Sequence, residues 1–263
     1  MILIIILFGV IGFLILGIFY DVIYYFFLEA KSQLSPYFFN ETHVRYLEKH
    51  FVYYKKLPPR SKKIFIHKVA RFMSSKDFIP RQMQSVTDEM KVLISASAAQ
   101  LTFGFRGIVF PYFYKIFVFP ESFYNHQNKA YHKGEVNPKM KAIALSWKDF
   151  VEGYLQEDGR NLGLHEMAHA LRLENRIMNS EYGFLDDTVL KKWENHARRT
   201  MIEIKNGEET FFRKYGGVNN EEFFAVAVEN FFERPVEFNE KHPMTYSTLC
   251  KLLHQDPLLL EKT

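Results

Sequence analysis

Two histidines and a glutamate fall within five consecutive residues of this chain, as His165, Glu166 and His169. On an α-helix, residues i and i+4 lie on one face, so both imidazoles can bind the same metal ion. The Glu166 carboxylate then lies where it can accept a proton from a metal-bound water molecule. The pattern predicts a zinc peptidase centre, with two neutral histidine ligands, a general base and an open position for water and substrate.

The residues around this motif argue against a chance match. In a chain of this composition, such a motif is expected at roughly 0.04 occurrences. The alternative is a surface helix that carries the three side chains by coincidence. Two histidines and a glutamate in a half-buried helix are costly without partners or a metal. The flanking residues are apolar and favour such a helix: Leu162, Leu164, Met167, Ala168 and Leu171.

Zinc needs a third protein ligand, and the spacing of residues leaves several candidates open. Glu194 or Asp187 would supply a carboxylate from the next helix, whereas His196 would give a site with three histidines. Glu221 or Glu222 would supply a carboxylate from a later helix. Glu221 shares its helical stripe with apolar residues, so the pattern alone leans slightly toward it.

The elements that must hold the metal helix are predicted from hydrophobic periodicity, helix caps and helix breakers. Strands are expected at 112–119 and 140–147, where β-branched and aromatic residues are frequent. Residues 121–138 have the composition of a polar loop, and their His126 and His132 lack the paired spacing of metal ligands. We expect an α+β fold of the zincin-like metallopeptidase type, mostly helical with a small β-sheet. The other expected helices cover 43–56, 60–74, 90–104, 187–204, 223–234 and 246–260, the last of them broken at Pro257.

The first 28 residues predict a transmembrane anchor. Residues 2–20 carry no charge, and a helix of this length would span about 28 Å, close to the hydrocarbon thickness of a bilayer. A cleaved signal peptide would instead need a basic start and a small-residue cleavage site. Lysines and arginines follow the span and none precedes it, which places the C-terminal part in the cytoplasm. We expect a single-pass membrane protein with an anchor at 1–28, a helical linker at 29–59 and a catalytic domain at 60–263.

The composition narrows the class of protein. The 263 residues include 27 Phe, and aromatic residues make up 17% of the chain, which suits a packed core. The net charge is only +4 and the basic residues are scattered, so nucleic acid is not expected as a partner. Cys250 is the single cysteine, so no intramolecular disulfide can form, which fits a reducing compartment.

Five stretches of the chain resemble, in order, a known family, the Mlc titration factor A zinc peptidases. The site architecture of that family is distantly related to the catalytic domain of anthrax lethal factor. Together the stretches cover roughly residues 57–260 and are more specific than the His-Glu motif alone. They are I-A-L-S-W-K-D-F at 143–150, N-L-G-L-H-E-M-A-H-A-L at 161–171, Y-G-G-V-N-N-E-E-F-F-A-V at 215–226, E-N-F-F at 229–232 and Q-D-P-L at 255–258.

The resemblance implies roles for five residues. His165, His169 and Glu222 would bind Zn2+. Glu166 would act as the general base, and the Tyr215 hydroxyl would stabilise the oxyanion of the transition state.

The chain also departs from the family pattern. Arg172 stands where the family often has an aspartate, so another residue such as Glu174 would have to orient a ligand. Glu229 follows Glu222 by about two helical turns and could either orient a ligand or be solvated. A membrane span is not general in the family.

The predicted function is zinc-dependent hydrolysis of peptide bonds by a membrane-anchored metallopeptidase, with a peptide or protein as substrate. The alternative is a membrane-tethered regulatory protein that binds or sequesters a cytoplasmic transcription factor, with zinc structural or vestigial. Glu166 and Tyr215 distinguish the two predictions, because binding alone would need neither side chain.

Overall fold

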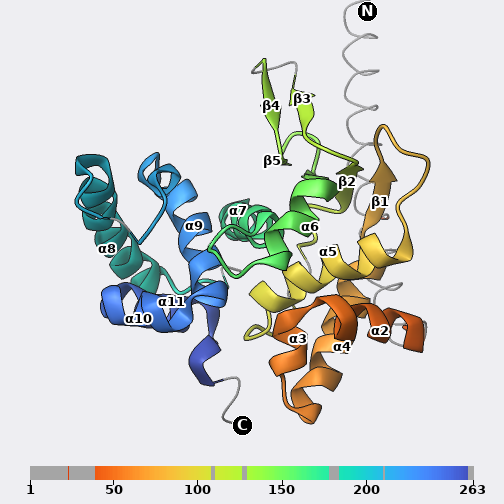
Figure 1. The fold of residues 1–263 in the computed structure, drawn as a ribbon, viewed down its shortest axis with the longest axis horizontal. Helices are drawn as coiled ribbons and strands as arrows, with labels where there is room; N and C mark the ends of the chain where they lie inside the picture. The colour runs from red at the N-terminus through yellow and green to blue at the C-terminus, as the bar shows by residue number, and fades with distance from the viewer. Residues whose placement is uncertain are drawn as a thin grey trace, which may run out of the picture.

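The computed structural model describes residues 23, 39–107, 110–125, 129–177, 184–209 and 211–259. These residues contain a four-stranded mixed sheet with the strand order β1-β2-β6-β5 (Figure 1). In the two central strands, the fully buried Ile116 pairs with the fully buried Ile143. The first three strands are parallel and the last runs antiparallel at the edge: β1 (Asp77–Pro80), β2 (Lys115–Phe119), β6 (Ala142–Ser146) and β5 (Gly134–Asn137).

The helices form two groups in Figure 1, with α7 between them. The first group comprises α2 (Glu41–His50), α3 (Val52–Lys56), α4 (Pro59–Ser74) and α5 (Asp88–Leu101). The second group comprises α8 (Asp187–Asn206), α9 (Asn220–Glu233), α10 (Pro235–Lys241) and α11 (Pro243–Leu253), with the 3-10 turns η2 (Lys214–Gly217) and η3 (Pro257–Leu259). Between the groups lie α6 (Trp147–Leu155) and α7 (Leu162–Ile177).

Helix α7 is buried on most of its sides. It contacts the helices α5, α6 and α9 and the strands β5 and β6. Five of its apolar residues are at most 1% exposed: Leu164, Met167, Ala168, Ala170 and Leu171. Polar side chains on such a helix are stable only when they are paired, so the neighbours of α7 must supply partners for its histidines and glutamate.

The segment 121–138 contains three short strands, and the prediction of a polar loop there was wrong. The strand β3 (Phe123–Asn125) pairs antiparallel with β4 (Ala130–His132), and this hairpin stands out from the sheet in Figure 1. Strand β5 follows and pairs with β6. Each of the three strands has only three or four residues, too few for a period of two to be visible in the sequence. His126 lies outside the described residues.

The prediction of a mostly helical α+β fold with a small sheet is confirmed. Both expected strands form, as β2 and β6. The helix expected at 43–56 is divided into α2 and α3 by Phe51, whose backbone is extended. Leu47 and Tyr54 from these helices share one hydrophobic core with Leu164 of α7. The division into an anchor, a linker and a catalytic domain stays a prediction.

The predicted membrane localisation is corrected by the structure. None of the helices in the described ranges combines the length and the apolar composition that a bilayer crossing requires. The longest of them, α8, has 20 residues but carries charged side chains along its whole length, because it packs only one face on the core. Of the anchor predicted at 1–28, only Ile23 belongs to the described residues.

Gly163 lets α7 lie close to its neighbours, and alanine at this position should destabilise the fold. A Cβ there would lie 2.5 Å from Cε2 of Phe150 and 2.6 Å from Oγ of Ser97. The free energy of unfolding, measured by chemical denaturation, should fall by about 1–3 kcal/mol, although alanine favours helices more than glycine. Gly216→Ala is the matched control, because its Cβ would make only ordinary contacts at 3.5–3.6 Å. An equal loss in both variants would contradict the prediction.

Candidate metal centre

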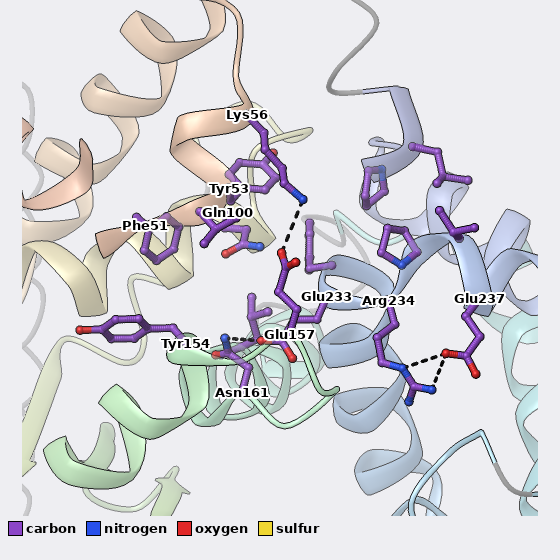
Figure 2. Close-up of a pocket in the computed structure, with 17 residues that line it drawn as sticks. Phe51, Tyr53, Lys56, Gln100, Tyr154, Glu157, Asn161, Glu233, Arg234 and Glu237 are labelled. Atoms are coloured by element: carbon purple, nitrogen blue, oxygen red, sulfur yellow. Dashed lines mark hydrogen bonds and ion pairs between the residues drawn. The ribbon is translucent and has the colours of Figure 1, made fainter. Parts of the chain in front are cut away.

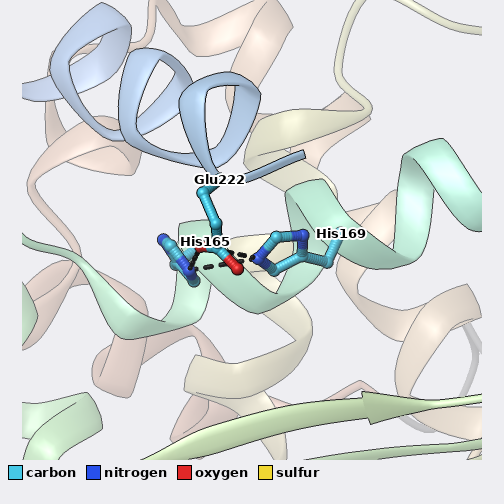
Figure 3. A group of neighbouring side chains, drawn as sticks. All are labelled: His165, His169 and Glu222. Carbon is cyan, nitrogen blue, oxygen red and sulfur yellow. Dashed lines mark hydrogen bonds and ion pairs between the residues drawn. The ribbon is translucent and has the colours of Figure 1, made fainter. Parts of the chain in front are cut away.

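Three side chains from two helices converge on one point (Figure 3). Nε2 of His165 and Nε2 of His169, both on α7, lie 3.1 Å apart. Oε2 of Glu222, in the first turn of α9, lies 3.2 Å from the first nitrogen and 3.4 Å from the second. The structure thus brings together atoms of three residues that could hold a metal ion.

This arrangement fits a metal ion better than a hydrogen-bonded cluster. Two imidazole nitrogens that face each other cannot both donate a hydrogen bond, and Oε2 of Glu222 is buried without a hydrogen bond of normal geometry. Ligand atoms at the usual distances from a tetrahedral zinc ion would be about 3.3–3.6 Å apart, and the observed separations are 3.1–3.4 Å. Two imidazoles and a carboxylate also form the protein donor set of many catalytic zinc sites.

The carboxylates around His165 control its protonation. Burial by itself lowers the pKa of His165, but Glu222 and Glu229 outweigh burial and raise this pKa to about 10. For Glu222, burial by itself raises the pKa of the carboxyl group. The two imidazoles outweigh burial and hold this pKa well below its ordinary value. The cluster therefore attracts positive charge, and a metal ion that binds must displace a proton from the imidazole.

Glu166 packs against the edge strand β5. The residue is only 5% exposed, and a Cβ on Gly134 would collide with its carboxylate. Burial raises the pKa of Glu166 to about 6, partly opposed by the two nearby histidines. Gly134 thus makes room for a carboxylate that can exchange a proton near neutral pH. Sequence patterns did not reveal Gly134, since glycine is common in segments with a loop-like composition.

Tyr215 lies in the turn η2, which precedes α9. The residue is 49% exposed, and its ring centroid lies 6.0 Å from that of His165. Burial and then the negative charge of Glu222 raise the pKa of the Tyr215 hydroxyl, so the hydroxyl keeps its proton. A neutral hydroxyl beside the cluster can donate a hydrogen bond to an oxygen that gains negative charge.

A cleft of about 640 Å³ opens beside the cluster. His165, Glu166 and Tyr215 line it, together with Tyr131 of the hairpin and Leu155 at the end of α6. The last two side chains are 74% and 66% exposed, so the cleft has apolar surface near its rim. Its size and mixed lining suit a segment of peptide.

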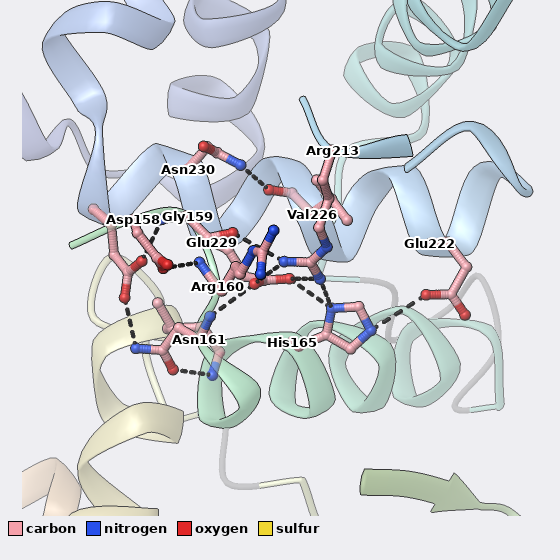
Figure 4. A network of polar contacts seen from close by, with 12 residues as sticks. Asp158, Gly159, Arg160, Asn161, His165, Arg213, Glu222, Val226, Glu229 and Asn230 are labelled. Atoms are coloured by element: carbon pink, nitrogen blue, oxygen red, sulfur yellow. Dashed lines mark hydrogen bonds and ion pairs between the residues drawn. The ribbon is translucent and has the colours of Figure 1, made fainter. Parts of the chain in front are cut away.

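Helices α7 and α9 are antiparallel and joined by a ladder of polar contacts (Figure 4). Three pairs of side chains form this ladder. On the α7 side the paired residues are four positions apart, and on α9 they are four or seven positions apart, so the residues from each helix lie on one face of it. The rungs are Asn161 with Glu233 (Figure 2), His165 with Glu229, and His169 with Glu222. The amide oxygen of Asn161 also accepts from the backbone N–H of Leu164 at 2.9 Å and so caps the start of α7.

Arg213 holds the middle rung of this ladder. Its guanidinium donates to both carboxylate oxygens of Glu229 at 2.7 Å and to the carbonyl of Gly159 at 3.0 Å. Oε1 of Glu229 lies 2.6 Å from Nδ1 of His165. This contact orients the ring so that its Nε2 faces Glu222. The sequence left the role of Glu229 open and did not single out Arg213, whose only signal is its position two residues before Tyr215.

The other candidates for a third ligand lie away from the imidazole pair. Glu194 instead accepts a hydrogen bond from Arg172 at 3.2 Å, and Glu221 accepts one from Arg176 at 3.1 Å. The remaining two candidates lie on α8 and do not belong to the group of converging atoms: Asp187 and His196.

Arg172, at the position of the family aspartate, connects helices rather than orienting a ligand. It is 8% exposed, and its guanidinium lies 5.4 Å from the ring centroid of Phe224 on α9. Glu174 accepts from the backbone N–H of Tyr112 at 2.9 Å and so holds the segment before β2. The contact that orients an imidazole comes instead from Glu229.

Comparisons with known proteins agree with the binding of a metal ion by this chain. A family model described as "Glucose-regulated metallo-peptidase M90" matches residues 28–254. An uncharacterized protein of Synechocystis, slr2042, is 26% identical over 223 residues, which is 79% of this chain and 81% of the relative. Mlc titration factor A from Escherichia coli (strain SMS-3-5 / SECEC) is 30% identical over 122 residues, which is 44% of this chain and 46% of the relative. Mlc titration factor A from Shigella flexneri gives the same values.

The resemblance to the Mlc titration factor A family is therefore confirmed, although this chain spans less than half of those curated relatives. The relation to lethal factor stays a prediction. Because the matched residues cover most of the chain and include every side chain of the candidate metal centre, this protein belongs to the glucose-regulated metallo-peptidase M90 family.

Proposed function

We propose that this chain is a zinc-dependent metallopeptidase that hydrolyses peptide bonds in short peptides or exposed protein segments. The observation that carries the proposal is the convergence of two imidazole nitrogens and one carboxylate oxygen within 3.4 Å of one another, beside the buried Glu166. His165, His169 and Glu222 would bind the metal. A zinc ion held there supplies a Lewis acid and lowers the pKa of a bound water molecule.

Glu166 acts as the general base in this proposal. Its carboxylate, with a pKa of about 6, accepts a proton from the attacking water and can return that proton to the leaving amine. The Tyr215 hydroxyl donates a hydrogen bond to the carbonyl oxygen as that oxygen gains charge. Glu229 and Arg213 keep the His165 ring in place throughout the reaction.

The name of a relative, Mlc titration factor A, motivates a second candidate function. In this alternative, the chain is a regulatory protein that binds a transcriptional regulator, and zinc is structural or vestigial. Hydrolysis requires Glu166 and Tyr215, whereas binding requires neither. A stoichiometric complex with an uncleaved regulator, formed equally well by a Glu166→Gln variant, would favour this alternative.

Replacing Glu166 by Gln should separate the chemistry from metal binding. An amide cannot accept the proton, so kcat/KM for a fluorogenic peptide should fall about 10²–10⁴-fold, while elemental mass spectrometry still finds about one zinc per chain. Glu222→Ala should lose the zinc as well. Glu221→Gln, the neighbouring carboxylate on α9, is the matched control and should keep both properties. If Glu166→Gln retains hydrolysis, the proposed mechanism is contradicted. If Glu222→Ala retains zinc, another residue must be the third ligand.

Removing the hydroxyl of Tyr215 should slow the reaction without loss of metal. In Tyr215→Phe, we expect kcat to fall about 10²–10³-fold, because one preorganised donor to the oxyanion is lost. KM and zinc content should change little. Tyr131→Phe removes a hydroxyl from the wall of the same cleft and should leave kcat within about two-fold of the parent. A similar loss in both variants, or unchanged kcat in Tyr215→Phe, would argue against this role.

Arg213 should influence metal affinity although it is not a ligand. In Arg213→Met, Glu229 loses its bidentate partner, and the His165 ring loses a fixed orientation, so zinc affinity should fall about 10–100-fold in competition with a chelator. Arg213→Lys restores one of the two hydrogen bonds and should recover part of the affinity. If both variants unfold at lower denaturant concentration but bind zinc as tightly as the parent, Arg213 has only a structural role.

A further inference from the structure

A second cleft, of about 530 Å³, lies between α4 and the segment that follows α5. None of its lining residues also lines the cleft beside the metal centre. In Figure 1, α4 and α9 lie on opposite sides of α7. Neither the family resemblance nor the proposed peptidase function assigns a role to this cleft.

Basic side chains dominate the lining of this second cleft. Lys63, His67 and Arg71 follow one another at intervals of four residues on α4, so they share one helix face. Arg106 lines the cleft from the opposing segment, and no acidic residue in the described ranges lines it. The net charge of the whole chain is only +4, so this lining is a local concentration of positive charge.

The opposing segment is held firmly in place. Nζ of Lys68 donates to the carbonyl oxygens of Thr102 at 3.1 Å and Phe105 at 2.6 Å, which ties the segment to α4. A Cβ on Gly104 would collide with the backbone of Leu253 at the end of α11, so the segment also packs closely on that helix. The two walls of the cleft therefore keep a fixed separation, which favours a preformed site.

The electrostatic environment in this cleft favours a negatively charged ligand. Burial and then the positive charge of Arg71 lower the pKa of Lys68 to about 8. Burial, followed by Arg71 and Lys68, also lowers the pKa of His67. The charged groups that act on these two side chains, among the residues that the structure describes, are thus cations, and an anion between the walls would offset the repulsion between them.

We propose that this cleft binds a small organic phosphate that carries at least two phosphate groups, of the size of a nucleoside diphosphate. Arginine side chains pair with phosphate oxygens in a fork, and a lysine adds a compact charge. A single inorganic phosphate would fill little of the 530 Å³. The apolar surface of Ile64 and Phe103 suits the organic part of the ligand. A monocarboxylate would supply too little charge for the surrounding cations.

Isothermal titration calorimetry of the full chain with ADP, at about 0.1 M salt, tests this proposal. We expect saturable binding that weakens about ten-fold or more when Lys63→Ala and Arg106→Ala are combined, because two charge-assisted contacts are lost. Both side chains are exposed, so the fold should persist. The pair Lys192→Ala and Arg198→Ala removes two charges from the exposed surface of α8 and should bind ADP as the parent does. Glu222→Ala should also bind ADP unchanged, which separates this cleft from the metal centre.

Pyrophosphate should compete with ADP, and adenosine should not bind. The proposal is overturned if neither ADP nor pyrophosphate binds saturably, or if adenosine binds as tightly as ADP. Equal weakening in the α8 control pair would also overturn it, since the effect would then depend on net charge alone. The protein could instead sediment with phosphatidylglycerol vesicles, without being released by pyrophosphate and without binding ADP. That result would overturn the proposal and identify a membrane-facing surface in place of a phosphate site.

Discussion

The candidate site depends on one buried carboxylate, that of Glu229. This residue is 1% exposed, and its two oxygens contact Arg213, His165 and the backbone N–H of Asn161. An isolated carboxylate at this depth would cost several kcal/mol. The start of α7, the middle of α9 and the segment before η2 must therefore be assembled together. The candidate metal ligand His165 is oriented by the same contacts that make this assembly stable.

The ladder between α7 and α9 also sets the register of the two helices. A slip of one residue along α9 would rotate its carboxylates by about 100° and remove every rung at once. Glu222 and Glu229 share a face because they are seven residues apart, close to two helical turns. The rung nearest the start of α7 uses Asn161 and Glu233, which fixes where α7 begins. Structural and functional contacts thus share one interface.

The second cleft is lined by α4, and the cleft beside the candidate metal centre is lined by α7. Both helices pack on one buried helix, α5. This helix contacts α4, which lines the second cleft, and α7, which carries the candidate ligands His165 and His169. Its central residues are small, Ser95 to Ala99, and almost fully buried, so its neighbours can pack closely. The side chain of Ser97 packs so closely on Gly163 of α7 that a Cβ at Gly163 would collide with it. The second cleft and the candidate metal centre are therefore separated by a single layer of tightly packed helix.

The sequence by itself determined the local part of the site. Helical spacing places His165 and His169 on one face whatever surrounds the helix, and the apolar flanks made its burial foreseeable. The spacing left the third ligand open, because the choice depends on whether α8 or α9 faces the imidazoles and, between Glu221 and Glu222, on how α9 is rotated against α7. Only tertiary packing decides that rotation, and it turns Glu222 toward the imidazoles and Glu221 toward solvent and Arg176. Contacts between segments that lie far apart in the chain were likewise not predictable from local spacing, because only tertiary packing brings those segments together.

Arg213 and Gly134 illustrate this last point. Arg213 meets Glu229 across 16 residues of chain, and no local pattern marks such a pair. Gly134 was hidden in a segment whose strands are too short for their period to be visible, and its importance lies in the carboxylate that packs against it. The sequence therefore determined which side chains could bind a metal within one helix. The tertiary structure decided which partners complete the site, because those contacts join elements that only folding brings together.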